Sequence, residues 1–358
     1  MKIGFDLSNI ANHKTGILRA NYNIYKNLII PKDQIYVFSF SNIKNKIEYN
    51  KNYFYFLSKE IRFVRFFWYN FILPFQLYFK GITVFFCNQR IPILNLNLKY
   101  VLVYHDFTWK NFPKTMRYSN YLLDKFFSKI SLKKANLIIT PSKSIKKELI
   151  NYSKNLKKKI YVVNWGGEIT PPKKNEFKIK KNLLFVGKFE PRKNLPLLIK
   201  AYYYLSNNLK KKHKLIIVGS KGWGLMNIRE YVKELNLIKY VKIYENISDK
   251  KLEYFYKSSL YTVLLSKYEG YGLPIIESLN YGTPVIVSSI PTLKEISGNC
   301  GIKVKTNNVE QITNKLNKAI TDIKLYKKFQ KNINKKTLPT WKKSGKRVSE
   351  ILLKNLKT

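Results

Sequence analysis

Apolar and polar residues alternate along the chain in short blocks that predict strands and helices in turn. In the first half, short blocks rich in β-branched and aromatic residues are bounded by polar or turn residues, which is typical of buried strands. These predicted strands are Lys2–Leu7, Ile35–Phe40, Tyr53–Leu57, Ile82–Cys87, Tyr100–Tyr104, Asn136–Thr140 and Ile160–Val163. Helical patterns separate them at Ile17–Leu28, Ile61–Phe79, Tyr118–Lys133 and Ser142–Tyr152, with Ser142 as an N-cap.

The same alternation returns after a polar, proline-containing stretch, Gly166–Lys181, which we interpret as a linker. The predicted strands beyond it are Asn182–Val186, Lys214–Val218, Val241–Tyr244, Tyr261–Leu265 and Pro284–Val287. The predicted helices are Leu195–Leu205, Ile228–Leu235, Lys250–Tyr256, Pro274–Tyr281 and Val309–Ile320. This alternation indicates parallel sheets with helices on both faces. We expect an α/β fold of two Rossmann-like domains facing across a cleft, with ligands at the carboxyl ends of the strands.

Composition narrows the class of protein. The length of 358 residues agrees with two domains, and 45% hydrophobic and 15% aromatic residues exclude a mostly disordered chain. The two cysteines, Cys87 and Cys300, exclude a disulfide scaffold and share no metal-ligand spacing with the histidines, so we expect a reducing compartment. We predict no signal peptide, because the N-terminus has no apolar stretch followed by a small-residue cleavage site. We predict no transmembrane helix, because the most apolar segment falls short of the roughly 20 residues that a span needs.

The charge balance is strongly positive, with 67 Lys and Arg residues against 21 Asp and Glu residues and a net charge of +46. One interpretation is attraction to a polyanion, either nucleic acid or an anionic membrane surface. The other is compositional drift, since Lys, Asn, Ile and Tyr are abundant throughout the chain. The sequence has no RNP-type aromatic motif, zinc-finger spacing or basic-zipper heptads, so we expect no specific nucleic-acid binding.

The segment Arg62–Phe79 allows two interpretations. On a helical wheel its broad apolar face is interrupted by one narrow polar stripe, which consists of Arg62, Arg65, Tyr69 and Gln76. A basic amphipathic helix of this kind can lie on a membrane. It can equally be a domain helix that packs against a sheet. We favour the domain helix, because the segment leads directly into the predicted strand at Ile82.

The main chemical signal is the loop Ser266–Glu277, which follows a predicted strand and runs into a helix near Pro274. Gly270 and Gly272 allow backbone amides to approach a ligand closely. The helix start adds unpaired N–H groups and the positive end of the helix dipole, which together suit a diphosphate. Of Glu269 in the loop and Glu277 in the first helical turns, one carboxylate can then meet a sugar while the other meets a ribose.

Two further loops directly follow predicted strands of the second half. The first loop is the run Val186–Asn194, which contains Gly187. Its residues Arg192 and Lys193 stand where they can pair with phosphate oxygens. The second loop, Val218–Gly224, is rich in glycine and contains Gly219.

Together these loops, the Glu269-x7-Glu277 motif and the run Tyr281–Val285 resemble the retaining, nucleotide-sugar-dependent glycosyltransferases of family 4, which have the GT-B fold. The likeness extends to the first half, where Val103–Thr108 is similar to that family's loop containing a His-Asp pair. Gly16 begins a run similar to its N-terminal glycine loop, with Leu18 in place of the second glycine. The subgroup looks like bacterial mannosyltransferases of surface-polysaccharide assembly.

The resemblance also implies the division of the chain and the roles of single residues. It implies an acceptor-side domain at 1–165, a linker at 166–181, a nucleotide-sugar domain at 182–337, and a closing helix at 338–358 that packs back on the first domain. It implies that Arg192 and Lys193 neutralise the leaving diphosphate, Glu269 contacts the transferring sugar, Glu277 contacts the ribose, and His105 lies near sugar and acceptor. Donor-binding backbone would come from Gly16, Gly187, Gly219, Gly270, Tyr271, Gly272 and Leu273.

We therefore expect a cytoplasmic, retaining hexosyltransferase, peripheral on the inner face of the cytoplasmic membrane. It would transfer mannose from GDP-mannose to a lipid-linked or lipopolysaccharide glycan. No metal ion is expected, because two cations and a helix end can stabilise the diphosphate as its charge develops. The alternatives are a UDP- or dTDP-sugar donor on the same fold, and a non-catalytic polyanion-binding protein.

Overall fold

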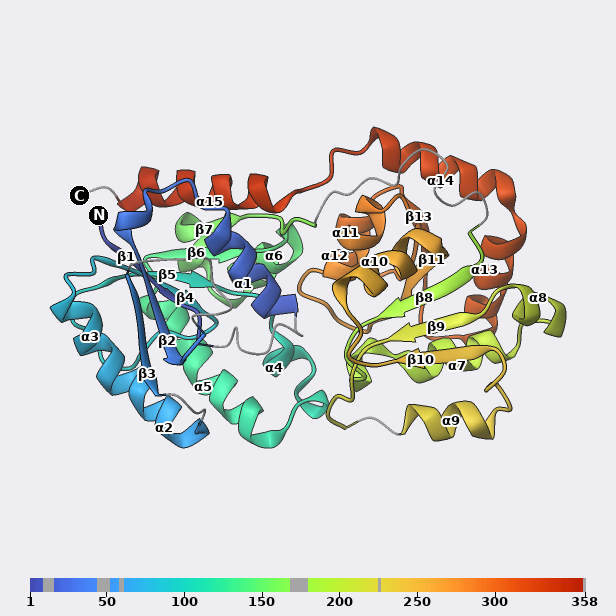
Figure 1. Cartoon of the computed structure of the whole chain (residues 1–358), viewed down its shortest axis with the longest axis horizontal. Coiled ribbons are helices and arrows are strands. Elements are labelled where there is room, and N and C mark those ends of the chain that lie inside the picture. Colours follow the sequence, from blue (N-terminus) through green and yellow to red (C-terminus); the bar gives the residue numbers. More distant parts are fainter. Residues whose placement is uncertain (9–15, 44–51, 58–60, 168–179, 225–226, 357–358) are drawn as a thin grey trace. The chain divides into compact units, whose positions relative to one another are not determined.

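The computed structural model describes residues 1–8, 16–43, 52–57, 61–167, 180–224 and 227–356. They form two compact units, each built on a parallel sheet with helices packed on its faces (Figure 1). The first unit comprises Met1–Asp106, Leu122–Gly166 and Pro339–Thr358, and the second comprises Phe107–Tyr121 and Gly167–Leu338. The predicted class, α/β with two Rossmann-like units, is confirmed. Most of the predicted linker lies outside the described residues.

The first unit contains a seven-stranded parallel sheet in the order β3-β2-β1-β4-β5-β6-β7. Its strands are β1 (Ile3–Asp6), β2 (Ile35–Ser41), β3 (Tyr53–Leu57), β4 (Val84–Asn88), β5 (Lys99–Val103), β6 (Leu137–Thr140) and β7 (Ile160–Val162). All of them lie at the predicted positions. The central strands β1, β4 and β5 are mainly apolar and buried, because a parallel sheet of this kind is covered on both faces.

The helices of this half connect the strands as the pattern predicts. They are α1 (Gly16–Lys26), α2 (Arg62–Phe67), α3 (Leu73–Phe79), α5 (Tyr118–Lys134) and α6 (Lys143–Tyr152), with short turns η2 (Lys32–Gln34) and η6 (Lys154–Lys159). Ser142 is the N-cap of α6, as predicted, because its hydroxyl accepts a hydrogen bond from the Ile145 N–H at 3.2 Å. No described helix is both long enough and apolar enough to cross a membrane.

The single helix predicted at Ile61–Phe79 is a continuous helical run with a π-helical turn, η4 (Trp68–Ile72), between α2 and α3. Pro74 explains the interruption, because it has no N–H and its ring clashes with the carbonyl four residues earlier. That carbonyl, on Asn70, instead accepts a hydrogen bond from the Leu94 N–H at 3.3 Å. The run packs on the sheet, since the Leu77 side chain lies directly over Gly4 of β1. The interpretation as a domain helix is therefore confirmed.

The second unit contains a six-stranded parallel sheet in the order β10-β9-β8-β11-β12-β13. Its strands are β8 (Asn182–Val186), β9 (Leu215–Val218), β10 (Val241–Tyr244), β11 (Ser259–Leu264), β12 (Val285–Ser288) and β13 (Gly301–Val304). The helices around it are α7 (Leu195–Tyr203), α8 (Asn207–Lys212), α9 (Ile228–Glu234), α10 (Asp249–Ser258), α11 (Leu273–Asn280), α12 (Pro291–Ser297), α13 (Val309–Thr321) and α14 (Ile323–Lys335).

Four of these elements were not predicted, namely α8, α12, β13 and α14. The strand β13 pairs only with β12 at the edge of the sheet, and its sequence, GIKV, places a lysine among the apolar residues. An edge strand tolerates such a residue because it is not enclosed on both sides. The short α8 is mainly polar and ends in three lysines, so its pattern carries no apolar face.

The segment Phe107–Tyr121 departs from the predicted division of the chain, which assigns it to the first domain. It belongs to the second unit and contains α4 (Thr108–Asn111) and η5 (Pro113–Thr115). The Phe107 N–H donates a hydrogen bond to the Tyr268 hydroxyl at 2.8 Å, and the Phe112 ring stacks on Tyr268 with centroids 5.4 Å apart. These contacts, which no local pattern reveals, attach the segment to the loop after β11.

The last helix, α15 (Trp341–Leu356), belongs to the first unit although it comes from the end of the chain (Figure 1). It packs against α1 and the turn that follows it. The Ile29 N–H donates to the Ser349 hydroxyl at 2.9 Å. At Gly345 the helices approach so closely that an added Cβ would lie 2.2 Å from the Asn27 carbonyl oxygen.

Candidate active site

The order of the second sheet identifies where its loops converge. The chain leaves β8 toward β9 on one side, and β11 lies on the other side of β8. The direction of winding therefore reverses between β8 and β11. In open α/β sheets this switch point is where ligands bind, because the loops after the two neighbouring strands turn away from each other and leave a crevice. The loops after β8 and β11 are the ones that contain the Arg192–Lys193 pair and the Glu269–Glu277 motif.

The two loops are held together by backbone and side chains. The Lys267 N–H donates a hydrogen bond to the Arg192 carbonyl at 2.8 Å. Arg192 and Lys193 lie in a single 3-10 turn, η7 (Pro191–Lys193). Asn194 ends this turn with a left-handed φ of 57°, a conformation that asparagine tolerates better than most residues. The sequence Pro191–Asn194 thus sets the local geometry that presents both cations to the neighbouring loop.

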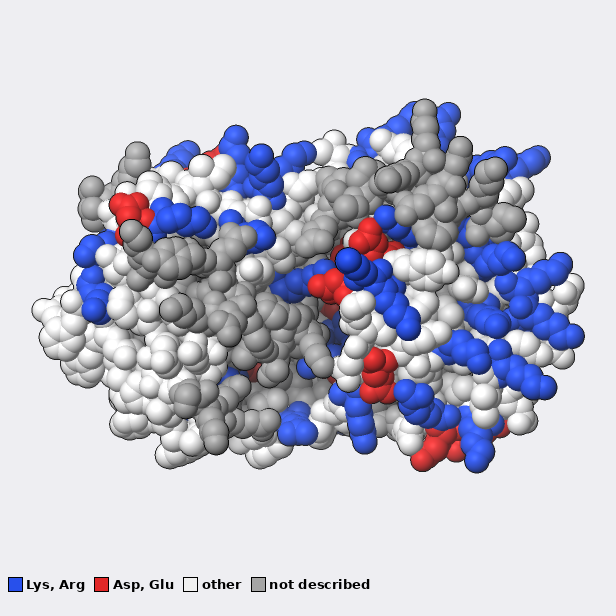
Figure 2. Space-filling view, viewed as in Figure 1, with Lys and Arg blue, Asp and Glu red and all other residues white. Residues whose placement is uncertain are grey.

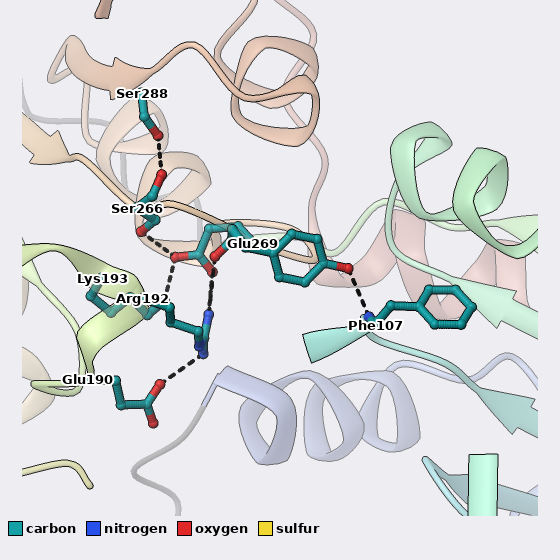
Figure 3. Close-up of polar contacts among 8 residues, drawn as sticks. Phe107, Glu190, Arg192, Lys193, Ser266, Glu269 and Ser288 are labelled. Carbon is teal, nitrogen blue, oxygen red and sulfur yellow. Dashed lines mark hydrogen bonds and ion pairs between the residues drawn. The ribbon is translucent and has the colours of Figure 1, made fainter. Parts of the chain in front are cut away.

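Glu269 is the centre of a buried ionic cluster (Figure 3). Its Oε1 accepts from the Lys193 Nζ at 2.5 Å and from the Ser266 hydroxyl at 2.6 Å. Its Oε2 accepts from an Arg192 guanidinium nitrogen at 3.2 Å. A second nitrogen of the same guanidinium pairs with Glu190 at 3.0 Å. The structure therefore brings Arg192, Lys193 and Glu269 together, as the motifs predict.

The cations determine the charge state of Glu269. Burial raises the pKa of its carboxyl group, but Lys193 and Arg192, with hydrogen bonds from Lys193 and Ser266, overcome this effect and lower the pKa to about 2. The carboxylate is therefore ionised at neutral pH. Two cations and two carboxylates, counting Glu190, give the cluster no net formal charge, and Glu190 is the more exposed of the two acids.

The start of α11 depends on a glycine. Gly272 is the N-cap residue of this helix and has a left-handed φ of 91°. A Cβ at this position would also lie 2.9 Å from the Leu293 side chain. Pro274 follows in the first turn of the helix, where its missing N–H leaves no intrahelical bond unmade. Gly270, Tyr271 and Leu273 of the same loop are also buried.

Glu277 lies one turn into α11 and is buried. Its Oε2 accepts a hydrogen bond from the Tyr256 hydroxyl at 2.7 Å. Tyr256 is fixed in turn by stacking on Tyr281, with ring centroids 5.7 Å apart. Glu269 is thus held by Lys193 and Arg192, and Glu277 accepts a hydrogen bond from a tyrosine that is itself stacked on another.

Glycines in the loops after β8 and β9 allow the backbones of these two loops to approach each other closely. An added Cβ at Gly219, after β9, would lie 2.0 Å from the Gly187 carbonyl oxygen, after β8. The Gly187 N–H donates to the Val218 carbonyl at 3.0 Å, which keeps the two strand ends in register. Gly187 and Gly219 lie directly after their strands, as predicted, and the Gly187 carbonyl lies against Gly219.

His105 and Gly16 belong to the first unit. Gly16 is the first residue of α1. His105 is buried at the end of β5, and its Nε2 lies 2.8 Å from the Asn88 side-chain oxygen at the end of β4. Burial lowers the pKa of His105 to about 4, although the nearby Asp106 opposes the shift. The imidazole is therefore neutral at neutral pH, and Asn88 orients it.

Several residues of these sites carry no predicted role. They are Asn88, Glu190, Ser266, Tyr268 and Ser288, whose hydroxyl donates to the Ser266 carbonyl at 2.5 Å. The sequence could have indicated a role for Ser266, because this residue directly follows a buried strand and precedes Glu269 by three residues. It gives no such indication for Asn88, since asparagine is common throughout this chain. Within the described part of the chain, no three His, Cys, Asp or Glu side chains are grouped as metal ligands would be.

The second half of the chain matches a known family. Residues 168–336 match the family described as glycosyl transferases group 1. The O-antigen chain mannosyltransferase B of Escherichia coli is 31% identical over 139 residues, which cover 39% of this chain and 36% of that protein. The O-antigen chain mannosyltransferase RfbU of Salmonella typhimurium is 28% identical over 61% of this chain and 59% of its own length. The chain thus spans less than two thirds of these relatives.

Solved structures resemble the whole chain. Sucrose-phosphate synthase from Thermosynechococcus elongatus superimposes with a TM-score of 0.73 at 18% identity, covering 99% of this chain and 98% of the other. WaaG, a glycosyltransferase involved in lipopolysaccharide biosynthesis, gives 0.72 at 16% identity over 93% and 94% of the two chains. HepE from Anabaena, solved with UDP-glucose, gives 0.74 at 15% identity over 99% and 100%. The chain has the GT-B fold, and its residues 168–336 match the family of glycosyl transferases group 1.

Proposed function

We propose that this protein is a retaining glycosyltransferase that moves mannose from GDP-mannose to a lipid-linked or lipopolysaccharide glycan. The observation that carries the proposal is the buried Glu269 carboxylate, bound by Lys193 and Arg192 at the switch point of the second sheet. Cations and a carboxylate at such a crevice suit a ligand that has both a diphosphate and a sugar. The E. coli and Salmonella relatives, both named as mannosyltransferases of the O-antigen chain, support the choice of sugar and acceptor.

The chemistry assigns each group a task. Breaking a glycosyl–phosphate bond leaves positive charge on the sugar and negative charge on the diphosphate. Arg192 and Lys193 stabilise the diphosphate as its charge develops, which lowers the barrier more than it stabilises the bound substrate. Glu269 fixes both cations and contacts the sugar. The backbone at Gly270–Leu273 and the start of α11 bind the phosphates, Glu277 binds the ribose hydroxyls, and no metal ion is required.

His105 serves the acceptor side in this proposal. Because its imidazole is neutral at neutral pH, it offers one hydrogen-bond donor and one acceptor and adds no charge near the reacting sugar. Asn88 occupies the Nε2 side of the ring, so the tautomer is decided by the bond to this amide.

Donor identity is tested by thermal unfolding of the purified protein with GDP, UDP, GDP-mannose and UDP- and dTDP-sugars. A ligand that binds only the folded state stabilises it by about 2.7 kcal/mol at a hundredfold excess over its Kd. We expect GDP and GDP-mannose to raise the Tm and the other nucleotides to have little effect. HepE was solved with UDP-glucose, so a selective shift with UDP-sugars would establish the alternative donor and overturn the choice of GDP-mannose.

Substituting a cation of this site distinguishes the effect of the site from the effect of the protein's general positive charge. Arg192→Ala should remove the shift with GDP and lower the rate of mannosyl transfer by about 100-fold or more, the usual effect of losing one preorganised donor. Arg229→Ala is the matched control, since this arginine of α9 is exposed and pairs with Glu245 at 3.1 Å. Equal activity of the Arg192 variant and the control would contradict the site assignment.

A polyanion-binding protein is the second candidate, and the net charge of +46 favours it. On the face that Figure 2 shows, Lys and Arg side chains are scattered rather than gathered in one groove. Binding that rests on such charge falls steeply with salt concentration. Salt-dependent binding of DNA together with no shift from any nucleotide or nucleotide sugar would favour this candidate over the transferase.

Location at the membrane follows from the proposed acceptor. A lipid-linked glycan under assembly presents its growing end at the inner face of the cytoplasmic membrane, and an excess of Lys and Arg is attracted to the anionic lipids there. We therefore place the protein at that surface as a peripheral protein.

A further inference from the structure

The helical run α2–η4–α3 exposes a row of aromatic side chains. Phenylalanines recur at every fourth residue, and the exposed fractions include 80% for Phe63, 47% for Phe75 and 79% for Phe79. The members of this row, which we call the phenylalanine stripe, are Phe63, Phe67, Phe71, Phe75 and Phe79. Large exposed apolar patches of this kind mark interaction sites, since an isolated surface gains nothing from them.

The π turn in the middle of the run keeps the stripe on one face. Residues four apart drift around an α-helix by about 40° at each step, because a turn contains 3.6 residues. The π turn η4 holds more residues per turn and therefore offsets part of this drift between Phe67 and Phe75. Phe67 and Phe71 remain adjacent across it, with ring centroids 5.1 Å apart.

The opposite face of the run is fixed to the protein. Trp68, Leu73 and Leu77 are fully buried, and the Trp68 indole N–H donates to the Gln76 side chain at 3.0 Å. Asn70 accepts from the Ile93 N–H through its side chain at 3.2 Å and donates to the Phe66 carbonyl at 2.8 Å. The stripe is therefore the outer surface of an anchored helix, and it is presented without a change of fold.

Charge around the stripe points to the nature of its partner. No acidic residue occurs between positions 61 and 80, and Figure 2 shows the surface over α2 and α3 as largely uncharged. The neighbouring α5 touches the run where Phe66 meets Phe127, with ring centroids 5.8 Å apart. It presents exposed Lys125, Lys129 and Lys133 at four-residue spacing. An apolar aromatic row beside a row of lysines matches the acyl boundary and the headgroups of an anionic bilayer.

We infer that the phenylalanine stripe inserts into the surface of an anionic lipid bilayer, with the lysines of α5 on its headgroups. The outer face of a helix is convex and lacks the hydrogen-bonding groups at its centre that a specific protein interface would use. Aromatic rings and lysines are the side chains that lie best at a membrane interface. This inference deepens the membrane location in the proposed function, but its test needs no glycosyl transfer, so either can fail alone.

The test is co-sedimentation of the full chain with vesicles of phosphatidylcholine alone and of phosphatidylcholine with phosphatidylglycerol. We expect binding to the anionic vesicles that persists in part at high salt, because burial of the rings is not screened. Phe63→Ser/Phe75→Ser/Phe79→Ser should weaken it by at least about tenfold. The matched control is Tyr204→Ser/Ile238→Ser/Ile323→Ser, which removes three exposed apolar side chains of the second unit and should leave binding unchanged.

Three results would overturn the inference. The first is no binding to either kind of vesicle. The second is binding that salt abolishes and that the two triple variants share equally, which would assign it to net charge alone. The third is self-association in analytical ultracentrifugation that the stripe variant removes while vesicle binding remains, which would make the stripe a contact between copies of this chain. Equal Tm values of the variants exclude loss of folding as the cause, and Phe→Leu at the same positions should restore binding.

Discussion

At the scale of single residues, Glu269 decides the stability of the ionic cluster. Removing one member of a buried ion pair leaves the other charge uncompensated, at a cost of about 3–5 kcal/mol. Because Lys193 is buried against Glu269, we expect Glu269→Gln to lower the free energy of unfolding by about 3 kcal/mol. Glu190→Gln is the control, since its side chain is 25% exposed and its pair should contribute less than about 1 kcal/mol. Urea denaturation measures both, and equal losses would contradict the central role of Glu269.

His105 makes the stability depend on pH. Its pKa is about 4 in the folded protein against 6.5 as an ordinary value, so between these values the unfolded chain binds more protons. The free energy of unfolding therefore falls as the pH is lowered from 6.5 to 4, by on the order of 3 kcal/mol. Glu269, with a pKa of about 2 against 4.5, adds a further loss below pH 4.5.

Urea titrations at pH 7 and pH 4.5 check this dependence. In His105→Asn the fall in the free energy of unfolding between the two pH values should be smaller by most of the His105 contribution. The same fall in the variant and the unsubstituted protein would show that His105 is not the titrating group.

At the scale of elements, the contact of α15 with α1 rests on one small residue. A side chain at Gly345 would collide with the Asn27 carbonyl, and overpacking of this kind typically costs about 1–3 kcal/mol. We expect Gly345→Val to lower the Tm by several degrees. Lys346→Val places the same β-branched residue at the neighbouring exposed position of the same helix and should have a small effect. Equal Tm values would show that α15 shifts without cost.

At the scale of the whole molecule, the first unit is completed by the end of the chain. Within residues 339–358, the helix α15 packs on α1, and its Ser344 hydroxyl also donates to the Asn164 carbonyl at 2.8 Å. Deletion of these residues should speed hydrogen exchange in β1 and α1 and leave β8 and β11 protected, because the second sheet makes its own core. Uniform loss of protection in both sheets would show instead that the two units unfold as one.

Much of this architecture was predictable from local pattern. Every strand of the first sheet and most elements of the second were predicted, because buried parallel strands read as short apolar runs. Among the missed elements, β13 has only four residues and contains Lys303, and α8 is mainly polar, so neither gives a clear apolar pattern. The same reasoning located the loops after β8 and β11, because a motif that directly follows a strand must lie at the carboxyl end of that strand.

The sequence by itself determined the class of fold, the order of the elements and the loops that hold Arg192, Lys193 and Glu269. Only the tertiary structure decided which groups meet. Lys193 and Glu269 are 76 residues apart, and Phe107 and Tyr268 are 161 apart. Periodicity reports which face of an element is buried, but a contact at such a separation depends on strand order, here the placement of β8 beside β11. The same distinction holds for the phenylalanine stripe. The four-residue spacing of its rings is present in the sequence, but their exposure depends on which face of the helical run the sheet covers.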